Sequence, residues 1–311
     1  MCQRIQGENY NMKIAVVSGK GGSGKSSVTA ALVVLAAADG RSVVAVDCDV
    51  DASNLPLLLE HEVFYQEQFA SGHDVLVDDT KCVGCGICAE ACRFNAISLN
   101  AISESSPKRL AKVNPYLCED CGLCIRLCPK AALDIVPDYS SSIYKSKSPY
   151  SVVVHGVLNP GDDNSGKMIA RLRELADSEF KVGREDDEIE ILDGPPGIGC
   201  PVLSTITGVD RVVFVCEPSL SGISDFKRVL KVCKSFCNDF LAIINKCDIN
   251  EDNCRQIRDI CTCEGIEVVA ELPLDRDMVR AQLECKTIIE YKPQSTISAA
   301  LRAASVKIFR K

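Results

Sequence analysis

The sequence predicts an α/β fold, with a doubly wound, mostly parallel sheet and a small α+β module inserted into it. Three observations support this. Short apolar strands alternate with helical segments over most of the 311 residues, as in parallel sheets with right-handed crossovers. A glycine-rich loop joins the first strand to the first helix. Between about residues 75 and 137 the alternation stops and cysteines cluster.

The composition narrows the classes of function. The chain is 46% hydrophobic, enough for a sizeable core, and its net charge of −8 argues against nucleic acid as a partner. No apolar run is long enough to predict a membrane span. The apolar stripe of Ile297, Leu301, Ala304 and Ile308 on the last helix fits packing on the sheet better than membrane binding, so a membrane partner is not expected.

Cysteine is unusually frequent, with 19 residues. The segment Met1–Asn11 is polar and lacks the apolar core of a secretion signal, so we expect a cytoplasmic protein. In a reducing compartment, thiols in this number indicate metal ligands rather than disulfides.

The core is predicted to comprise residues 12–74 and 138–311, with the inserted module at 75–137. Segment 137–149, rich in Ser, Tyr and Lys, is interpreted as a connecting linker. The predicted strands are 12–17, 42–46, 151–157, 188–192, 211–216, 240–245 and 267–271. The predicted helices are 25–39, 166–178, 223–236, 253–264 and 295–309.

Residues 18–27, with the sequence Ser-Gly-Lys-Gly-Gly-Ser-Gly-Lys-Ser-Ser, form the glycine-rich loop. Glycines let successive backbone N–H groups face one anion, and the following helix N-terminus favours negative charge. Lys25 supplies a charge for the β- and γ-phosphates of ATP, and Ser26 supplies a hydroxyl for Mg²⁺. The expected phosphate-contacting residues are Gly21, Gly22, Gly24, Lys25, Ser26 and Ser27.

Two cysteine runs repeat about 36 residues apart. Their spacing, Cys-x₂-Cys-x₂-Cys-x₃-Cys, is the bacterial ferredoxin run for [4Fe-4S] clusters. In two-cluster ferredoxins the fourth cysteine of each run serves the other cluster. One cluster should therefore use Cys82, Cys85, Cys88 and Cys128, and the other Cys118, Cys121, Cys124 and Cys92. A zinc site is the alternative. Arg93 stands where proline usually follows the fourth cysteine, and either raises the potential of the nearby cluster or lies on the surface.

The glycine-rich loop, with its second lysine Lys20, resembles the deviant Walker A motif of the nitrogenase iron protein, MinD, ParA and Mrp families. The resemblance implies a P-loop NTPase fold of the SIMIBI type and an ATP-dependent homodimer, in which Lys20 reaches the partner's nucleotide. It gives Asp49 the role of orienting the attacking water, and it places Asp47 nearer the metal. Residues 191–197 look like a Walker B motif and switch II.

The same resemblance implies that Asp193 holds Mg²⁺ through water and that Gly197 senses the γ-phosphate. It also implies that Asn245 contacts adenine. Together, the motifs are similar to MinD-superfamily ATPases with an inserted two-cluster ferredoxin domain. Cys200 is either a further cluster ligand, as in the nitrogenase iron protein, or a buried free cysteine.

Three functions fit these features. The preferred one is an ATPase that couples an ATP-driven dimer switch to electron transfer through two [4Fe-4S] clusters. The second is an iron–sulfur cluster or metallocofactor assembly ATPase, and the third is a regulatory switch of the MinD or ParA kind. The expected partners are a second copy of the chain and a redox or iron–sulfur client protein.

Overall fold

The computed structural model describes residues 12–101, 109–159, 164–180 and 188–310. The expectation for Met1–Asn11 lies outside the described residues. The chain divides into two compact units. The larger comprises Met1–Glu67, Ile143–Val157 and Ser165–Lys311, and the smaller comprises Gln68–Ser142 and Leu158–Asn164. The predicted module 75–137 lies within the smaller unit.

The centre of the larger unit is a sheet with nine strands in the described residues. The strand order is β13-β12-β11-β1-β10-β2-β9-β8-β3. The pairs from β13 to β9 are all parallel, which confirms the mostly parallel sheet. Its strands are β1 (Met12–Ser18), β2 (Ser42–Asp47), β3 (Glu62–Phe69), β8 (Ser141–Lys147), β9 (Val152–Val157), β10 (Glu188–Pro196), β11 (Arg211–Cys216), β12 (Phe240–Asn245) and β13 (Glu267–Leu272).

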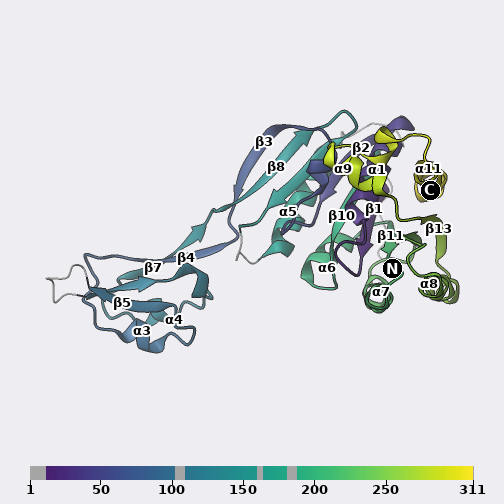
Figure 1. Cartoon of the computed structure of the whole chain (residues 1–311). Coiled ribbons are helices and arrows are strands. Elements are labelled where there is room, and N and C mark those ends of the chain that lie inside the picture. Colours follow the sequence, from purple (N-terminus) through teal and green to yellow (C-terminus); the bar gives the residue numbers. More distant parts are fainter. Residues whose placement is uncertain (1–11, 102–108, 160–163, 181–187, 311) are drawn as a thin grey trace, which may run out of the picture. The chain divides into compact units, whose positions relative to one another are not determined.

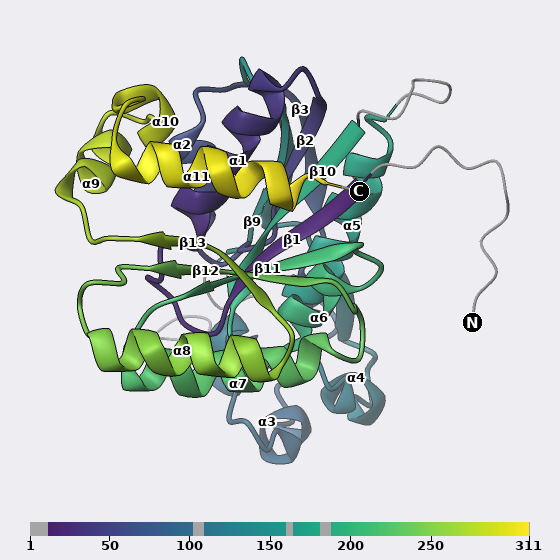
Figure 2. The ribbon, with the colours of Figure 1, turned by 90° about the vertical axis from the view of Figure 1, so that its right-hand side faces the viewer.

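Helices cover both faces of this sheet (Figures 1 and 2). In Figure 2, α1 and α11 lie along one face, and α7 and α8 lie along the other. The buried strands are mostly apolar, as expected for a sheet that is covered on both sides, although β10 also buries Glu188, Glu190 and Asp193. The helices are α1 (Lys25–Ala38), α2 (Leu55–Leu58), α5 (Ser165–Asp177), α6 (Cys200–Ile206), α7 (Leu220–Cys233), α8 (Glu251–Cys263), α9 (Arg276–Leu283), α10 (Ile288–Tyr291) and α11 (Thr296–Ile308).

The apolar stripe of the last helix packs into the core. Ile297, Leu301, Ala304 and Ile308 of α11 are fully buried in one cluster with residues of α1 and the sheet. Ser295 begins the helix by accepting a hydrogen bond from Ser298 N. The packing interpretation of this stripe is therefore confirmed.

Two two-stranded antiparallel sheets are found in the described part of the smaller unit, pairing β4 with β7 and β5 with β6. Each cysteine run lies between two of these strands and contains a short helix. The elements are β4 (Gly72–Val77), α3 (Ile87–Ala91), β5 (Ile97–Ala101), β6 (Arg109–Val113), the 3₁₀ turn η1 (Pro115–Leu117), α4 (Leu123–Leu127) and β7 (Leu133–Asp138). The order strand, run, helix, strand thus occurs twice.

One sequence interpretation is wrong. Segment 137–149 is not a linker, because Ser141–Lys147 forms β8 and joins the large sheet next to β9. The strand was missed because its inward positions include serine, with Ser141 and Ser146 buried beside Ile143. A four-residue turn closed by Ser148 N and Ser151 O then leads directly into β9.

Candidate nucleotide site and cysteine cavities

The glycine-rich loop joins β1 to α1 and forms one wall of an open cavity of about 470 Å³. Helix α1 begins directly after Gly24, whose φ of 89° is left-handed. A Cβ atom on Gly24 would lie 2.2 Å from Nδ2 of Asn245, so only glycine fits there. The predicted residues that line the cavity are Lys20, Gly21, Gly22, Gly24, Lys25, Ser26, Ser27 and Asp49.

Lys25 is directed at the acidic end of β10. Its Nζ lies 2.8 Å from Oδ1 of Asp193, and Thr29 Oγ1 donates to the same oxygen at 2.8 Å. Burial opposes the charge of Lys25, but Asp193 and the nearby acids outweigh it and raise the pKa of the lysine. Within the described chain, Oδ2 of Asp193 is buried without a hydrogen-bond partner, which leaves an acceptor for a further donor.

Asp47 is the last residue of β2, the strand that pairs with β10, and Asp49 follows two residues later. Asp47 is fully buried, and its carboxylate accepts hydrogen bonds from Asp49 N at 3.0 Å, Ser53 Oγ at 2.9 Å and Leu55 N at 3.0 Å. Burial and the charge of Asp193 raise its pKa to about 7. Burial, opposed by Lys25, raises the pKa of Asp49 to about 6. Both groups lie in a field that favours an added cation.

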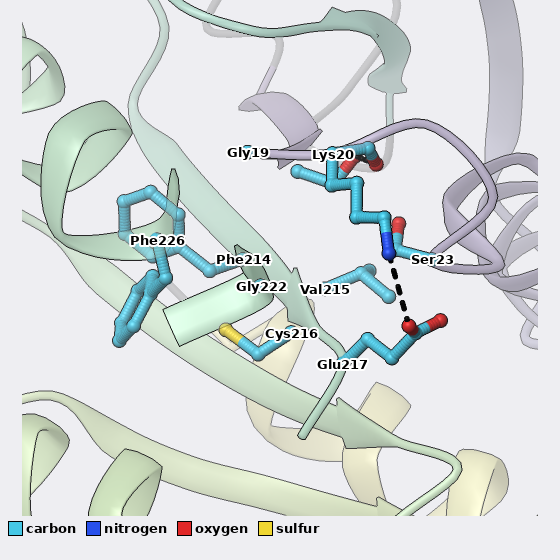
Figure 3. Close-up of a pocket in the computed structure, with 10 residues that line it drawn as sticks. Gly19, Lys20, Ser23, Phe214, Val215, Cys216, Glu217, Gly222 and Phe226 are labelled. Atoms are coloured by element: carbon cyan, nitrogen blue, oxygen red, sulfur yellow. Dashed lines mark hydrogen bonds and ion pairs between the residues drawn. The ribbon is translucent and has the colours of Figure 1, made fainter. Parts of the chain in front are cut away.

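The second lysine of the loop, Lys20, is paired within its own chain. Its Nζ lies 3.5 Å from Oε1 of Glu217 at the end of β11, as Figure 3 shows. Lys246 Nζ donates to the other oxygen of Glu217 at 2.6 Å and to Gly22 O at 2.9 Å. Burial alone would raise the pKa of Glu217, but these two lysines hold it below its ordinary value.

Asn245 supports the loop. Its Nδ2 donates to Ser23 O at 2.8 Å, and its Oδ1 accepts from Lys246 N at 3.0 Å. The side chain is buried and is not among the residues that line the cavity. Its contact with adenine therefore stays a prediction.

Further residues reach the cavity without having been predicted. Asn54, Leu57 and Leu58 line it from α2 and the turn before it, and Gln282 of α9 donates to Ser27 Oγ at 2.5 Å. Pro196 also lines it, and Gly197 follows with a left-handed φ of 96°. Cys200 is exposed at the start of α6, so the interpretation of a buried free cysteine is wrong for this residue.

The eight cysteines of the two runs gather around separate cavities in the smaller unit. One cavity of about 20 Å³ is lined by Cys82, Cys85, Cys88 and Cys128. Another of about 280 Å³ is lined by Cys92, Cys118, Cys121 and Cys124. In each cavity, three cysteines of one run meet the fourth cysteine of the other run.

Backbone N–H groups point at the crossing sulfur atoms. Ala96 N donates to Cys92 Sγ at 3.4 Å, and Ala132 N donates to Cys128 Sγ at 3.2 Å. The Ala132 amide and neighbouring amides lower the pKa of Cys128, which favours its thiolate form. Burial raises the pKa of Cys118.

Among the described residues, no group of three or more His, Cys, Asp or Glu side chains is arranged so that it could hold a single metal ion. Each of the two cavities is lined by four cysteines, the number of thiolate ligands that a [4Fe-4S] cluster takes. None of the described helices is long and apolar enough to cross a membrane.

A family model agrees with this arrangement. The model of the CobQ/CobB/MinD/ParA nucleotide binding domain matches residues 14–288. The chain belongs to this family. The glycine-rich loop, the acids Asp47 and Asp193 of β2 and β10, and the parallel sheet that brings them together are the features expected of a nucleotide binding domain.

Several curated relatives are similar to this member of the family. An uncharacterized protein of Methanocaldococcus jannaschii is 35% identical over 78% of this chain and 80% of its own length. An iron–sulfur cluster carrier protein of Pyrococcus abyssi is 21% identical over 88% of this chain and 79% of its own. A component of the Na⁺-translocating ferredoxin:NAD⁺ oxidoreductase complex of Acetobacterium woodii is 39% identical over 21% of this chain and 17% of its own.

Among solved structures, the septum site-determining protein MinD of Pyrococcus horikoshii, in complex with Mg-ADP, has a TM-score of 0.57. The comparison covers 97% of each chain at 18% sequence identity. This likeness confirms that the fold is of the MinD and ParA kind.

Proposed function

We propose that the protein is an ATPase that couples a nucleotide-driven dimer switch to one-electron transfer through two [4Fe-4S] clusters in its smaller unit. The observation that carries the proposal is the crossed arrangement of cysteines. Each cavity takes three thiols from one run and the fourth from the other, as a pair of cubane clusters requires.

At the nucleotide site, the residues position a triphosphate and neutralise its charge, which is most of what phosphoryl transfer asks of a protein. Lys25 exchanges Asp193 for the β- and γ-phosphates, and Ser26 and Asp193 would hold Mg²⁺. Asp49 lines the cavity and is the residue proposed to orient the attacking water. Lys20 exchanges Glu217 for the nucleotide of a second copy, so that ATP closes a homodimer.

In the smaller unit, the eight cysteines would hold the clusters, and the amides at Ala96 and Ala132 would stabilise charge on the sulfur atoms. Bound clusters would supply sites that each take up and release one electron. The surrounding unit keeps water from the buried thiols of Cys82 and Cys88, whereas Cys85 and Cys121 are exposed. The exposed positions suit exchange of electrons with a partner protein.

The chain connects the two sites over a short distance in sequence. Asp47, beside Lys25 and Asp193, binds Ser53 and Leu55 directly. Helix α2 begins at Leu55, and β3 then leads into the smaller unit at Gln68. A change at the carboxylates that hold the nucleotide is therefore passed to the segment that carries the cysteines.

The test is electron delivery from anaerobically purified, dithionite-reduced protein to an oxidised viologen dye, followed by stopped-flow absorbance. MgATP should change the rate in the wild-type protein and leave it unchanged in the Lys25→Ala variant. An equal rate with and without MgATP in the wild-type protein, at saturating nucleotide, would exclude the coupling.

A second candidate function, an iron–sulfur cluster carrier, is favoured by the similarity to the Pyrococcus abyssi carrier protein. It predicts that clusters leave the protein. Incubation with an apo-ferredoxin and an iron chelator separates the candidates: a carrier transfers its iron to the apo-protein in an ATP-dependent way, whereas an electron-transfer protein retains it.

A further inference from the structure

The two cysteine runs differ between their first and second cysteines. The first run has Val83 and Gly84 there, and the second has Glu119 and Asp120. The second run thus carries two acidic residues at positions where the first has none. This difference breaks the twofold symmetry of the smaller unit at the place closest to the ligands.

The backbone is alike at the two positions although the residues differ. Gly84 has a φ of 67° and Asp120 a φ of 48°, both left-handed. At Gly84 a Cβ atom would lie 2.2 Å from Arg109 O, so that position must remain glycine. Asp120 holds the same conformation with a side chain, which aspartate tolerates better than most residues but still at some cost in energy.

Contacts on both oxygens fix the carboxylate of Asp120. Oδ2 accepts a hydrogen bond from His73 N at 3.0 Å, at the start of β4. Oδ1 lies 3.8 Å from Sγ of Cys118, within the distance of a weak S–H hydrogen bond. The carboxylate of Asp120, whose side chain is 34% exposed, thus has one oxygen beside a predicted cluster ligand and the other 3.8 Å from Nδ1 of His73.

The charged residues that line the two cavities differ. Glu119 and Arg93 line the cavity of Cys118, and Asp120 adds its charge at the sulfur. The guanidinium of Arg93 is stacked over Phe94, 4.6 Å from the ring centroid. Lys130 is the charged residue that lines the cavity of Cys82. The Cys118 side thus has two acids and one base, and the Cys82 side has a base.

We propose that Asp120 sets the order of reduction of the two clusters, which rests on the function proposed above. Its fixed negative charge lowers the reduction potential of the cluster bound by Cys92, Cys118, Cys121 and Cys124. One electron added to the oxidised protein then resides on the cluster bound by Cys82, Cys85, Cys88 and Cys128. No bond forms or breaks in this step, and the electron comes from an external one-electron donor.

The test is an EPR-monitored redox titration of the anaerobic holoprotein, with dithionite as reductant. Asp120→Asn keeps an oxygen for His73 N and removes only the charge, and Asp120→Gly installs the residue found in the first run. Asp252→Asn removes the same charge from an exposed position on α8 of the larger unit and is the matched control. Iron content reports whether each variant still binds both clusters.

The wild-type protein should show two midpoint potentials. In both Asp120 variants the lower midpoint potential should rise by about 59 mV, which corresponds to a change of about tenfold in the equilibrium constant for one-electron reduction. The higher potential, and both potentials of the control, should stay unchanged. Movement of the higher potential, or of neither, in iron-replete variants would overturn the role of Asp120. Wild-type protein without iron would instead overturn the proposed function on which it rests.

Discussion

Lys25 Nζ and Asp193 Oδ1 lie 2.8 Å apart, so the lysine of the glycine-rich loop and the acid at the end of β10 form a buried ion pair across the nucleotide site. The lysine and Asp193 are 7% and 0% exposed in their side chains. A pair this deeply buried makes each partner dependent on the other, because removal of one leaves an uncompensated charge.

Lys25→Ala is expected to abolish MgATP binding and to destabilise the protein by about 3 kcal/mol, because Asp193 loses its counter-charge. Titration with a fluorescent ATP analogue measures the first effect, and urea unfolding without nucleotide measures the second. Lys227→Ala, at an exposed position on α7, is the control and should change neither. Retention of wild-type affinity in Lys25→Ala would show that this loop does not bind the phosphates.

The raised pKa of Asp49 predicts a pH-dependent cost of folding. The folded protein binds a proton at Asp49 with a pKa of about 6, against 3.8 ordinarily. The cost of the ionised form is therefore absent below about pH 4, grows as the pH rises, and is complete above about pH 6.

Asp49→Asn should accordingly stabilise the protein at pH 8, by about 1 kcal/mol after allowance for solvent screening, and should leave stability unchanged at pH 4. Urea unfolding without nucleotide and Mg²⁺ at the two pH values measures this difference. The same variant should lose ATP hydrolysis while it still binds ATP. A variant that is less stable than the wild-type protein at pH 8 would contradict the assigned burial cost.

Lys20→Ala tests the dimer. Because Lys20 pairs with Glu217 of its own chain here, its removal should leave ATP affinity within about threefold of the wild-type value. It should, however, abolish the ATP-dependent dimer, since the lysine is proposed to bind the partner's nucleotide. Sedimentation velocity with and without MgATP measures this. If the Lys20→Ala protein still formed a dimer with ATP, Lys20 would not be needed to bind the partner's nucleotide.

Crossed ligation can be tested by single Cys→Ser substitutions. Cys128→Ser and Cys82→Ser should both lose the same cluster, because both residues line one cavity. Cys92→Ser should lose the other cluster. Iron should fall from about eight to about four atoms per chain in each variant.

Cys263→Ser is the control for this series, since Cys263 is exposed on α8 of the larger unit and should not affect iron. EPR spectra of the reduced variants show which cluster remains. If Cys128→Ser and Cys124→Ser gave the same spectrum, each run would hold a cluster by itself and the crossing would be wrong.

Much of the large sheet could be predicted from the sequence because parallel strands that are buried on both faces consist mostly of apolar residues. The strand at 211–216 and the helices at 25–39 and 295–309 were predicted to within a few residues of β11, α1 and α11. The strand β3 at the edge of the sheet and its neighbour β8 were not predicted, because polar residues make up at least half of each strand and resemble a surface segment.

The site was predictable where short-range spacing defines it, as in the loop at Lys25 and in the cysteine runs. Contacts between distant segments were not. Glu217 pairs with Lys20 of the loop, and Gln282 binds Ser27, across about 200 and 255 residues of sequence. Thr29 donates a hydrogen bond to Asp193, although in the sequence it resembles any other helix residue. Such pairings depend on strand order, which no local pattern encodes.

Coupling between nucleotide and clusters is the central claim, and the reduction potentials measure it most directly. Two EPR-monitored titrations of anaerobic protein, one with MgATP and one without nucleotide, should give different midpoint potentials for at least one cluster. The Lys25→Ala variant should give the same potentials in both. If saturating MgATP left the midpoint potentials of both clusters unchanged in the wild-type protein, the proposed coupling would be contradicted.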